Sequence, residues 1–427
     1  MELIIKDPVH NYVGIKLENE PLLVTILGSY EVQRLRRITQ LGMASVAYPG
    51  AEHSRFGHSL GTMHIARKIL DQFYLNGELS TEVYQEDREL LSIAALVHDI
   101  GHGPFSHAFE DVIISSHSDI TVQMLFGDTE LHDMLIRWDP ELPNRIGSVI
   151  TGNHSRSYLT NLIASQLDAD RLDYVLRDAT MCGVKYGIFD LDRIIHTLHL
   201  RDGALLVSEK GQGAVEEYLL ARYFMYWHVY FHKTILSQTK VFLNTIKRAL
   251  DLYRTRKTVF LSSPFLDILI SSEMKKVNIM AYAQLDESDV IVHLKQWMHS
   301  DDRILKDLAM RFITRRPFKT MVFQNKESVV AAEKIICRIL ENRDFPPEYY
   351  VGIESPKKSL YYYYTPEEKN ERDQNIYLET VHGKAVEISS SSGSIIRNLI
   401  NPAPEKFFIF YPGEITDELK ANGMTLL

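Results

Sequence analysis

The sequence predicts a mainly α-helical fold, with small β-hairpins and a small α+β domain toward the C-terminal end. Helix-length apolar runs recur as far as about residue 315, and residues 214–256 contain neither proline nor glycine. Beyond residue 318, β-branched and aromatic stretches alternate with loops rich in proline, glycine and charge. A chain of 427 residues also exceeds what one hydrophobic core usually holds. We therefore predict two domains, 1–317 and 318–427.

The predicted elements begin with a short strand or hairpin over residues 1–17, where apolar and polar residues alternate. Helices are predicted around residues 20–40, 58–75, 86–99, 105–114, 117–126, 158–180 and 189–200. The segment "DGALLVSEKG" predicts a small hairpin, and the run 214–256 predicts one or two long helices. In the C-terminal domain, strands are predicted at "KTMVFQNK", "YYVGIES", "SLYYYYT", "AVEIS" and "KFFIFYP", and a helix at "SVVAAEKIICRILEN".

Composition excludes several classes of protein. The net charge of −9 argues against a general nucleic-acid binder, so a nucleic-acid partner is not favoured. Cys182 and Cys337 are too few for a disulfide framework or a thiolate metal site. No apolar run approaches the roughly 18 residues of a membrane span, and "MELIIKDPVHNY" has no secretory apolar region. We expect a cytoplasmic protein with no membrane partner.

The segment "LVHDIGHGPFSH", residues 96–107, concentrates three histidines and an aspartate at the end of an apolar helix. His98 and Asp99 follow the apolar run 90–97, which carries them toward the interior. A histidine beside an aspartate is most often a surface or capping pair. A buried carboxylate, however, needs a partner, and a bound cation is one common remedy. Imidazole with carboxylate suits Mn, Fe, Zn, Ni or Mg.

Two further segments supply candidate ligands for such a metal. "HSRFGHSLG" places His58 at the start of a helix, and "DADRLDYVLRDA" contains Asp170. Asp170, Tyr174 and Asp178 are spaced to share one face of a helix. An acidic helix face taken alone is more often solvated than catalytic. Combined with the His98–Asp99 pair, it predicts a metal centre.

Ordered blocks of the sequence resemble the HD-domain phosphohydrolases, and in particular the deoxynucleoside triphosphate (dNTP) triphosphohydrolases of the SAM-and-HD-domain and bacterial types. The blocks are "DPVHNYVGI", "QRLRRITQLGMASVAYPGAEHSRFGHSLG", "LVHDIGHGPFSH", "DADRLDYVLRD" and "ARYFMYWHVYFHK", and they span roughly residues 3–240. The resemblance implies a helical HD-domain core in which one divalent metal is bound by His58, His98, Asp99 and Asp170. It also implies that the scissile phosphate is surrounded by His102, His107, Glu110 and His117. Pro104 is expected at the first position of a new helix.

The resemblance also implies which side chains bind the substrate. The basic positions matched to a polyphosphate are Arg55, Arg171 and Arg222, where Arg171 replaces a lysine more common in the family. The positions matched to the sugar are Gln40, Tyr174 and Asp178 for the 3′-hydroxyl and Tyr230 for the ring, and Tyr226 stands where relatives can have histidine. On one continuous helix, Arg222, Tyr226, Tyr230 and Lys233 would share a face. The alternative is a plain aromatic core face.

The implied reaction is hydrolysis of a dNTP to a deoxynucleoside and inorganic triphosphate. A water-derived nucleophile would attack the α-phosphorus, and His107 would protonate the leaving 5′-oxygen as general acid. One alternative is an HD phosphohydrolase that acts on nucleoside monophosphates or cyclic nucleotides. Another is a non-catalytic module that senses nucleotides or binds single strands.

The resemblance finally implies a homo-oligomer, a tetramer or a dimer, with a regulatory nucleotide site between subunits. Gln33 and Arg36 match positions used at that site. Leu3 and Gly28 occupy the places where GTP-activated relatives have lysine and aspartate. Leucine cannot neutralise a phosphate and glycine cannot accept from the guanine edge. We therefore expect no strict requirement for GTP.

Overall fold

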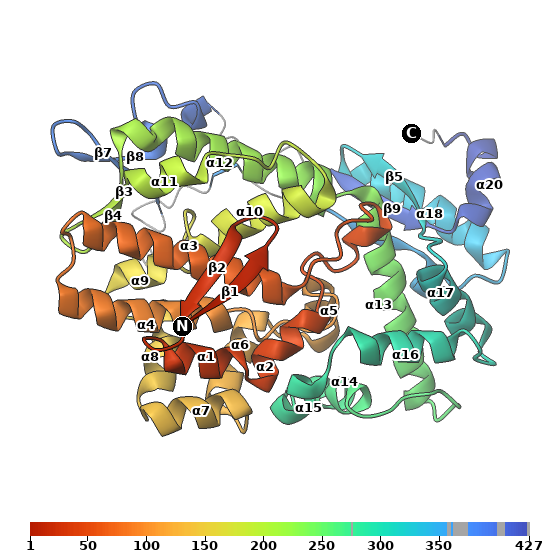
Figure 1. Cartoon of the computed structure of the whole chain (residues 1–427). Helices are drawn as coiled ribbons and strands as arrows, with labels where there is room; N and C mark the ends of the chain where they lie inside the picture. The colour runs from red at the N-terminus through yellow and green to blue at the C-terminus, as the bar shows by residue number, and fades with distance from the viewer. Residues whose placement is uncertain (275, 357–359, 362–374, 399–405, 425–427) are drawn as a thin grey trace.

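The computed structural model describes residues 1–427 except 275, 357–359, 362–374, 399–405 and 425–427 (Figure 1). Its largest region is built from the helices α1 (Pro21–Leu27), α2 (Tyr30–Arg34), α3 (Arg55–Leu75), α4 (Thr81–Val97), α5 (His107–Ile113), α6 (His117–Phe126), α7 (Glu130–Trp138), α8 (Leu142–Thr151), α9 (Ser157–Asn161), α10 (Ala169–Cys182), α11 (Leu191–Thr197), α12 (Gln212–Met225), α13 (Lys233–Arg254), α14 (Phe265–Glu273), α15 (Ile279–Gln284), α16 (Glu287–Trp297) and α17 (Arg303–Ile313). These helices enclose one continuous hydrophobic core. The prediction of a mainly α fold is confirmed. Among the described residues, none of the helices is long and apolar enough to cross a membrane.

Three helices at the centre of this region position the site. The last turns of α4, residues 90–97, are completely enclosed, which explains why all of them but Ser92 are apolar. Helix α10 begins where the Asp168 carboxylate accepts a hydrogen bond from the Arg171 backbone N–H, and it ends at Gly183, whose φ of 69° suits glycine. Helix α3 packs against both α4 and α10. The C-terminal end of α4 therefore meets the N-terminal turns of α3 and α10.

The helix predicted over residues 158–180 is interrupted in the structure, and the run 214–256, predicted as one or two helices, forms two. The span 158–180 contains α9 and α10, separated by a non-helical stretch over residues 162–168. The span 214–256 contains α12, a π-helical turn over Tyr226–Tyr230, and then α13. Because α13 begins at Lys233, the expected shared face does not extend from Tyr230 to Lys233. The wider π turn shifts the direction of the side chains beyond it.

The described strands form three small sheets. The N-terminal hairpin pairs β1 (Glu2–Asp7) with β2 (Asn11–Lys16) in antiparallel register. A second sheet has the order β3-β4-β7-β8, from β3 (Leu198–Arg201), β4 (Ala204–Ser208), β7 (Tyr377–Glu379) and β8 (Ala385–Glu387). A third has the order β5-β9-β6, from β5 (Lys319–Phe323), β9 (Phe407–Tyr411) and β6 (Gly352–Glu354), and packs with α18 (Lys326–Glu341), α19 (Pro347–Tyr350) and α20 (Thr416–Ala421).

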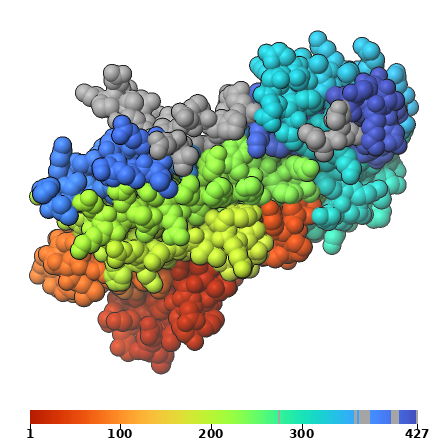
Figure 2. Space-filling view, turned by 90° about the horizontal axis from the view of Figure 1, so that it is seen from above, coloured from red at the N-terminus to blue at the C-terminus, as the bar shows by residue number. Residues whose placement is uncertain are grey.

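The C-terminal part of the chain is divided between two places. Strand β7 pairs in parallel with β4 of the helical region, and Leu378 belongs to the large core. Figure 2 shows this blue segment against the green surface of the helical region, away from the cyan residues that follow residue 318. The boundary predicted at residue 317 did not anticipate this return. The strand predicted at "SLYYYYT" lies outside the described residues, apart from Leu360 and Tyr361.

Candidate active site

The structure brings together the four residues predicted to bind a metal. His58 projects from the first turn of α3, His98 and Asp99 follow the last residue of α4, and Asp170 lies in the first turn of α10. The Oδ1 atom of Asp170 lies 3.0 Å from Nε2 of His58 and 3.7 Å from Nε2 of His98. Asp99 Oδ2 lies 3.6 Å from Nε2 of His58. Two imidazoles and two carboxylates therefore converge from three helices.

The chemistry of these donors fits a divalent metal. The Nδ1 atom of His58 is held by Asp173 Oδ2 at 2.8 Å, and that of His98 by the Ala95 carbonyl at 2.8 Å. Both Nε2 atoms are then directed at the centre, where they are buried and face the Asp170 carboxylate. Burial lowers the pKa of His58, but hydrogen bonds to Asp170 and Asp173 outweigh it and raise the pKa to about 10. The carboxylates gathered around the two imidazoles favour a bound cation. A set of His and Asp ligands suits Mn, Fe, Zn, Ni or Mg.

Asp173 orients His58, one of the predicted metal ligands, and sequence reasoning missed it. Its carboxylate is fully buried and also accepts from His10 Nε2 at 2.6 Å and from Arg177 Nε at 2.8 Å. Gly61 makes room for this group, because a Cβ there would lie 1.8 Å from Asp173 Oδ1. Its place one helical turn after Asp170 was a usable signal. Its contact with His10, 163 residues away, was not.

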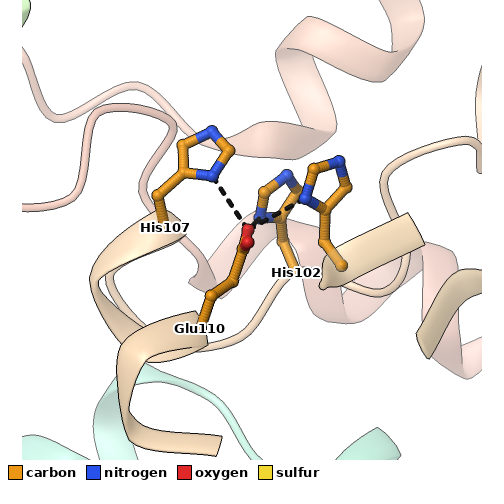
Figure 3. Close-up of side chains that lie close together, drawn as sticks. His102, His107 and Glu110 are labelled. Carbon is orange, nitrogen blue, oxygen red and sulfur yellow. Dashed lines mark hydrogen bonds and ion pairs between the residues drawn. The ribbon is translucent and has the colours of Figure 1, made fainter. Parts of the chain in front are cut away.

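The four residues predicted around the scissile phosphate form a second cluster beside the metal centre (Figure 3). Glu110 Oε1 accepts from Nδ1 of His107 at 2.8 Å and from Nδ1 of His117 at 2.9 Å, and Nδ1 of His102 lies 3.7 Å away. Burial raises the pKa of Glu110, but its hydrogen bonds from His107 and His117 outweigh this and lower it to about 2. Glu110 is therefore a carboxylate at any working pH.

The loop that connects α4 to α5 holds this cluster through close backbone contacts. A Cβ on Gly101 would lie 2.0 Å from the carbonyl oxygen of His117, so only glycine fits. The prediction that Pro104 begins a helix is wrong. Pro104 lies in a turn closed by Ser106 N–H donating to the Gly103 carbonyl at 2.9 Å, and α5 begins only at His107. Phe105 and Ser106 have φ values of 60° and 55°, which a right-handed helix cannot contain.

Arg55 links this loop to the metal centre. Its guanidinium donates to Asp99 Oδ2, to Ser106 Oγ at 2.8 Å and to the Gln40 carbonyl at 3.4 Å. Burial lowers the pKa of His102, and nearby Arg55 lowers it further, well below its usual value. The ring of His102 is therefore neutral, and it stacks on that of His117 with centroids 3.9 Å apart.

A cavity of about 450 Å³ opens beside both clusters. The predicted substrate residues among its lining are Gln40, Arg55, Tyr174, Asp178, Tyr226 and Tyr230. Inside it, the Tyr230 hydroxyl donates to Asp178 Oδ2 at 2.7 Å. The buried His53, which sequence reasoning missed, contacts Asp178 Oδ1 through Nε2 at 2.8 Å. The cavity has the size of typical small-ligand sites.

Two of the predicted phosphate-binding arginines lie outside the cavity lining. Arg222 is buried and donates to the Leu360 carbonyl at 3.1 Å. Arg171 is paired with the capping residue Asp168, whose Oδ2 lies 3.4 Å from its Nε. Neither guanidinium lines the cavity in this conformation, whereas Arg55 does.

The predicted regulatory residues lie together, with Gln33 on α2 and Arg36 in the 3-10 turn that follows it over Leu35–Arg37. Arg36 Nε donates to Gln33 Oε1 at 2.8 Å, and its guanidinium lies over the Phe56 ring, 3.6 Å from the centroid. Gln33 Nε2 donates to the Leu27 carbonyl at 2.7 Å. The pair is adjacent to α3, which carries Arg55 and His58.

Known families match the part of the chain that contains this site. The HD domain matches residues 55–178, which include all four predicted metal ligands, and the HD associated region matches residues 189–263. Uncharacterized protein YwfO of Bacillus subtilis is 36% identical over 97% of this chain and 93% of its own length. A crystal structure of a phosphohydrolase from Bacteroides thetaiotaomicron superposes with a TM-score of 0.83, at 29% identity, over 96% of this chain and all of that one.

Some of the relatives have names that describe an activity. The deoxynucleoside triphosphate triphosphohydrolase SAMHD1 homolog of Dictyostelium discoideum is 30% identical over 54% of this chain and 46% of its own length. The bovine SAMHD1 is 31% identical over 45% of this chain and 37% of its own length. This chain therefore spans less than half of either relative. The HD-domain matches and the phosphohydrolase neighbour make it a metal-dependent hydrolase in general terms. The chain belongs to the HD-domain phosphohydrolase family.

Proposed function

We propose that this protein hydrolyses deoxynucleoside triphosphates to deoxynucleosides and inorganic triphosphate. One observation carries the proposal. A single cavity is lined by the metal-centre carboxylates Asp99 and Asp170, by the imidazoles of His102, His107 and His117, and by the Asp178–Tyr230 pair. These three histidines and Glu110 are called the phosphate cluster below. A carboxylate and a phenol hydroxyl held together can form hydrogen bonds with a sugar hydroxyl. The Arg55 guanidinium and the imidazoles at the other end of the lining suit a phosphate. The names of the SAMHD1 relatives support the same substrate class.

A divalent metal bound by His58, His98, Asp99 and Asp170 would supply a polarised phosphoryl oxygen or an acidified water. His107 is the best placed proton donor, because its side chain is 70% exposed and lines the cavity. Its Nδ1 is bound to Glu110, which leaves Nε2 for the leaving 5′-oxygen. Arg55, His102 and His117 would stabilise negative charge on the α-phosphate.

Discrimination against ribonucleotides is assigned to the aromatic wall of the cavity. The Tyr174 and Tyr230 rings meet edge to face, with centroids 6.3 Å apart, and Tyr226 lies edge-on to Tyr230 at 4.9 Å. Packed rings of this kind cannot withdraw to admit an extra hydroxyl. Gln40 Oε1 is buried and has no hydrogen-bond partner among the described residues, so it is an acceptor for the sugar 3′-hydroxyl.

The test is to incubate metal-loaded protein with each dNTP, each NTP, a deoxynucleoside monophosphate and a cyclic nucleotide in isotopically labelled water. We expect deoxynucleoside and triphosphate from dNTPs alone, with the solvent oxygen in the triphosphate. Asp170→Asn is expected to be inactive, and Asp192→Asn, which changes only an exposed ion pair with Lys68, is the matched control. Release of pyrophosphate or orthophosphate, or turnover of the monophosphate alone, would contradict the proposal.

We also propose that the protein forms a homo-oligomer, in which Gln33 and Arg36 contact a regulatory nucleotide. The Arg36 guanidinium is exposed on one side and fixed on the other by Phe56 and Gln33, as a phosphate-binding fork requires. We expect basal dNTP hydrolysis without GTP and a tetramer or dimer by sedimentation. Assays with and without added GTP check this, and an absolute dependence on GTP is the contrary result.

A further inference from the structure

The phosphate cluster contains a complete set of metal-ligand atoms of its own. His102, His107, Glu110 and His117 each offer one ligand atom, and these four atoms all lie within 4.8 Å of one another. Figure 3 shows the imidazole rings turned toward the Glu110 carboxylate. The three Nδ1 atoms lie 2.8, 2.9 and 3.7 Å from the same oxygen, Oε1. The three nitrogen atoms and this oxygen are therefore grouped closely enough to contact a single ion.

These donors match a particular class of metal. Three imidazoles and one carboxylate are typical ligands of Zn²⁺, which binds four nitrogen and oxygen ligands in a tetrahedron. Mg²⁺ prefers oxygen ligands and would leave this cluster empty. The Nδ1 atom of His102 is buried and has no hydrogen-bond partner among the described residues, although it is directed at Glu110. A ligand atom is thus already desolvated and unpaired inside the cluster.

The cluster is also reachable and electrostatically prepared. His107, Glu110 and His117 have side chains that are 70%, 24% and 27% exposed, so an ion can enter from the cavity. The guanidinium of Arg55, which lies close enough to lower the pKa of His102, is paired with Asp99 and does not compete for Glu110. Binding requires only that His107 and His117 shift their protons from Nδ1 to Nε2. The cost is the two hydrogen bonds to Glu110, which makes this site weaker than the metal centre.

We propose that the phosphate cluster is a second, weaker site for Zn²⁺, and that its occupation inhibits the enzyme. The inhibitory part rests on the proposed function, because it requires His107 as proton donor and His102 with His117 as phosphate ligands. A bound Zn²⁺ takes the three Nδ1 atoms and the Glu110 carboxylate. A neutral, zinc-bound imidazole gives up its Nε2 proton far less readily than an imidazolium, so His107 no longer acts as general acid. Excess Zn²⁺ then stops turnover while the metal centre stays loaded.

The binding test uses Zn²⁺ alone on the metal-free full-length protein, with stoichiometry read by calorimetry and by elemental analysis after dialysis. We expect two equivalents in the wild type. His107→Gln and Glu110→Gln are expected to weaken the second by more than about 100-fold, beyond the loss of an outer-shell partner, and to keep the first. Asp170→Asn should lose the first and keep the second. His132→Gln, an imidazole on α7 bound to the Leu125 carbonyl at 2.8 Å, is the control and keeps both.

The inhibition test adds Zn²⁺ to wild-type enzyme that is turning over a dNTP in Mg²⁺ or Mn²⁺. We expect activity to fall at the Zn²⁺ concentrations that fill the second equivalent. One equivalent in the wild type, or a second equivalent that survives in both His107→Gln and Glu110→Gln, overturns the site. Two equivalents without inhibition overturn the inhibitory role. Because stoichiometry is measured without substrate, failure of the dNTP reaction does not affect the binding result.

Discussion

Replacing Asp173 by asparagine would keep its shape and remove its negative charge. Asp173 accepts from His58 Nδ1 at 2.8 Å, and this hydrogen bond fixes the tautomer that presents Nε2 to the metal. A hydrogen bond to a charged group contributes about 1.5–3 kcal/mol, and 1.4 kcal/mol corresponds to a factor of ten in affinity. We therefore expect Asp173→Asn to weaken metal binding about 10- to 100-fold.

The variant also disturbs Arg177, so stability needs a control of its own. Arg177 is buried between Asp173 and Asp7, with Nη1 donating to Asp7 Oδ2 at 2.8 Å. Asp7→Asn removes the other carboxylate but leaves the contact between Asp173 and His58. Both variants are expected to lose about 1–3 kcal/mol of unfolding free energy in the metal-free state.

The assay is titration of metal-free protein with Mn²⁺ by calorimetry, together with urea unfolding of the same samples. The reasoning predicts that the two variants lose similar stability and that only Asp173→Asn loses metal affinity beyond a factor of a few. Wild-type affinity in Asp173→Asn refutes the orienting role. An equal loss of affinity in Asp7→Asn refutes it as well, because the effect would then come from general loosening of the fold.

Three further outcomes follow from the structure. His107→Gln is expected to lower kcat about 10²–10⁴-fold with little change in substrate affinity, and single-turnover kinetics beside a binding titration separate the two; an unchanged kcat contradicts the assignment. Tyr230→Ala opens the aromatic wall, so hydrolysis of NTPs relative to dNTPs should rise at least tenfold or so in competition assays, while Tyr230→Phe keeps the ring and the selectivity. Burial lowers the pKa of His64 to about 4, so the folded state resists a proton that the unfolded chain takes up below about pH 6.5. Its contribution to stability is complete above pH 6.5 and is lost as the pH falls toward 4. Urea unfolding at pH 7 and pH 5 should therefore show a smaller loss in His64→Gln than in the wild type, and equal losses argue against it.

The parts of the site that local sequence determines were predictable. His98 and Asp99 directly follow a buried helix, so their place at its inner end is encoded within a few residues. Other features depend on contacts between distant segments. The role of Asp173 depends on His10 and Arg177, and the turn at Pro104 depends on hydrogen bonds to Thr39 and Glu287. Local patterns carry no signal for such contacts.

The fold shows the same division. The helices follow apolar periodicity, and the mainly α class was predicted correctly. The π turn over Tyr226–Tyr230 contains only residues that an ordinary helix accepts, so the local sequence does not predict it. Strands β7 and β8 have three residues each, too short for a reliable alternation, and β7 was not predicted.

The parallel pairing of β4 with β7 has a consequence for synthesis of the protein. Val207 pairs with Leu378, so one edge of β4 stays unpaired until the ribosome has made about 170 further residues. Until then β4 presents an open edge, the kind of surface on which nascent chains associate with one another. A fragment cut after α17 would keep that edge permanently. The segment that contains β7 thus covers an edge of the helical region only late in synthesis. The helical region and the C-terminal part of the chain therefore cannot be exchanged or expressed as independent units.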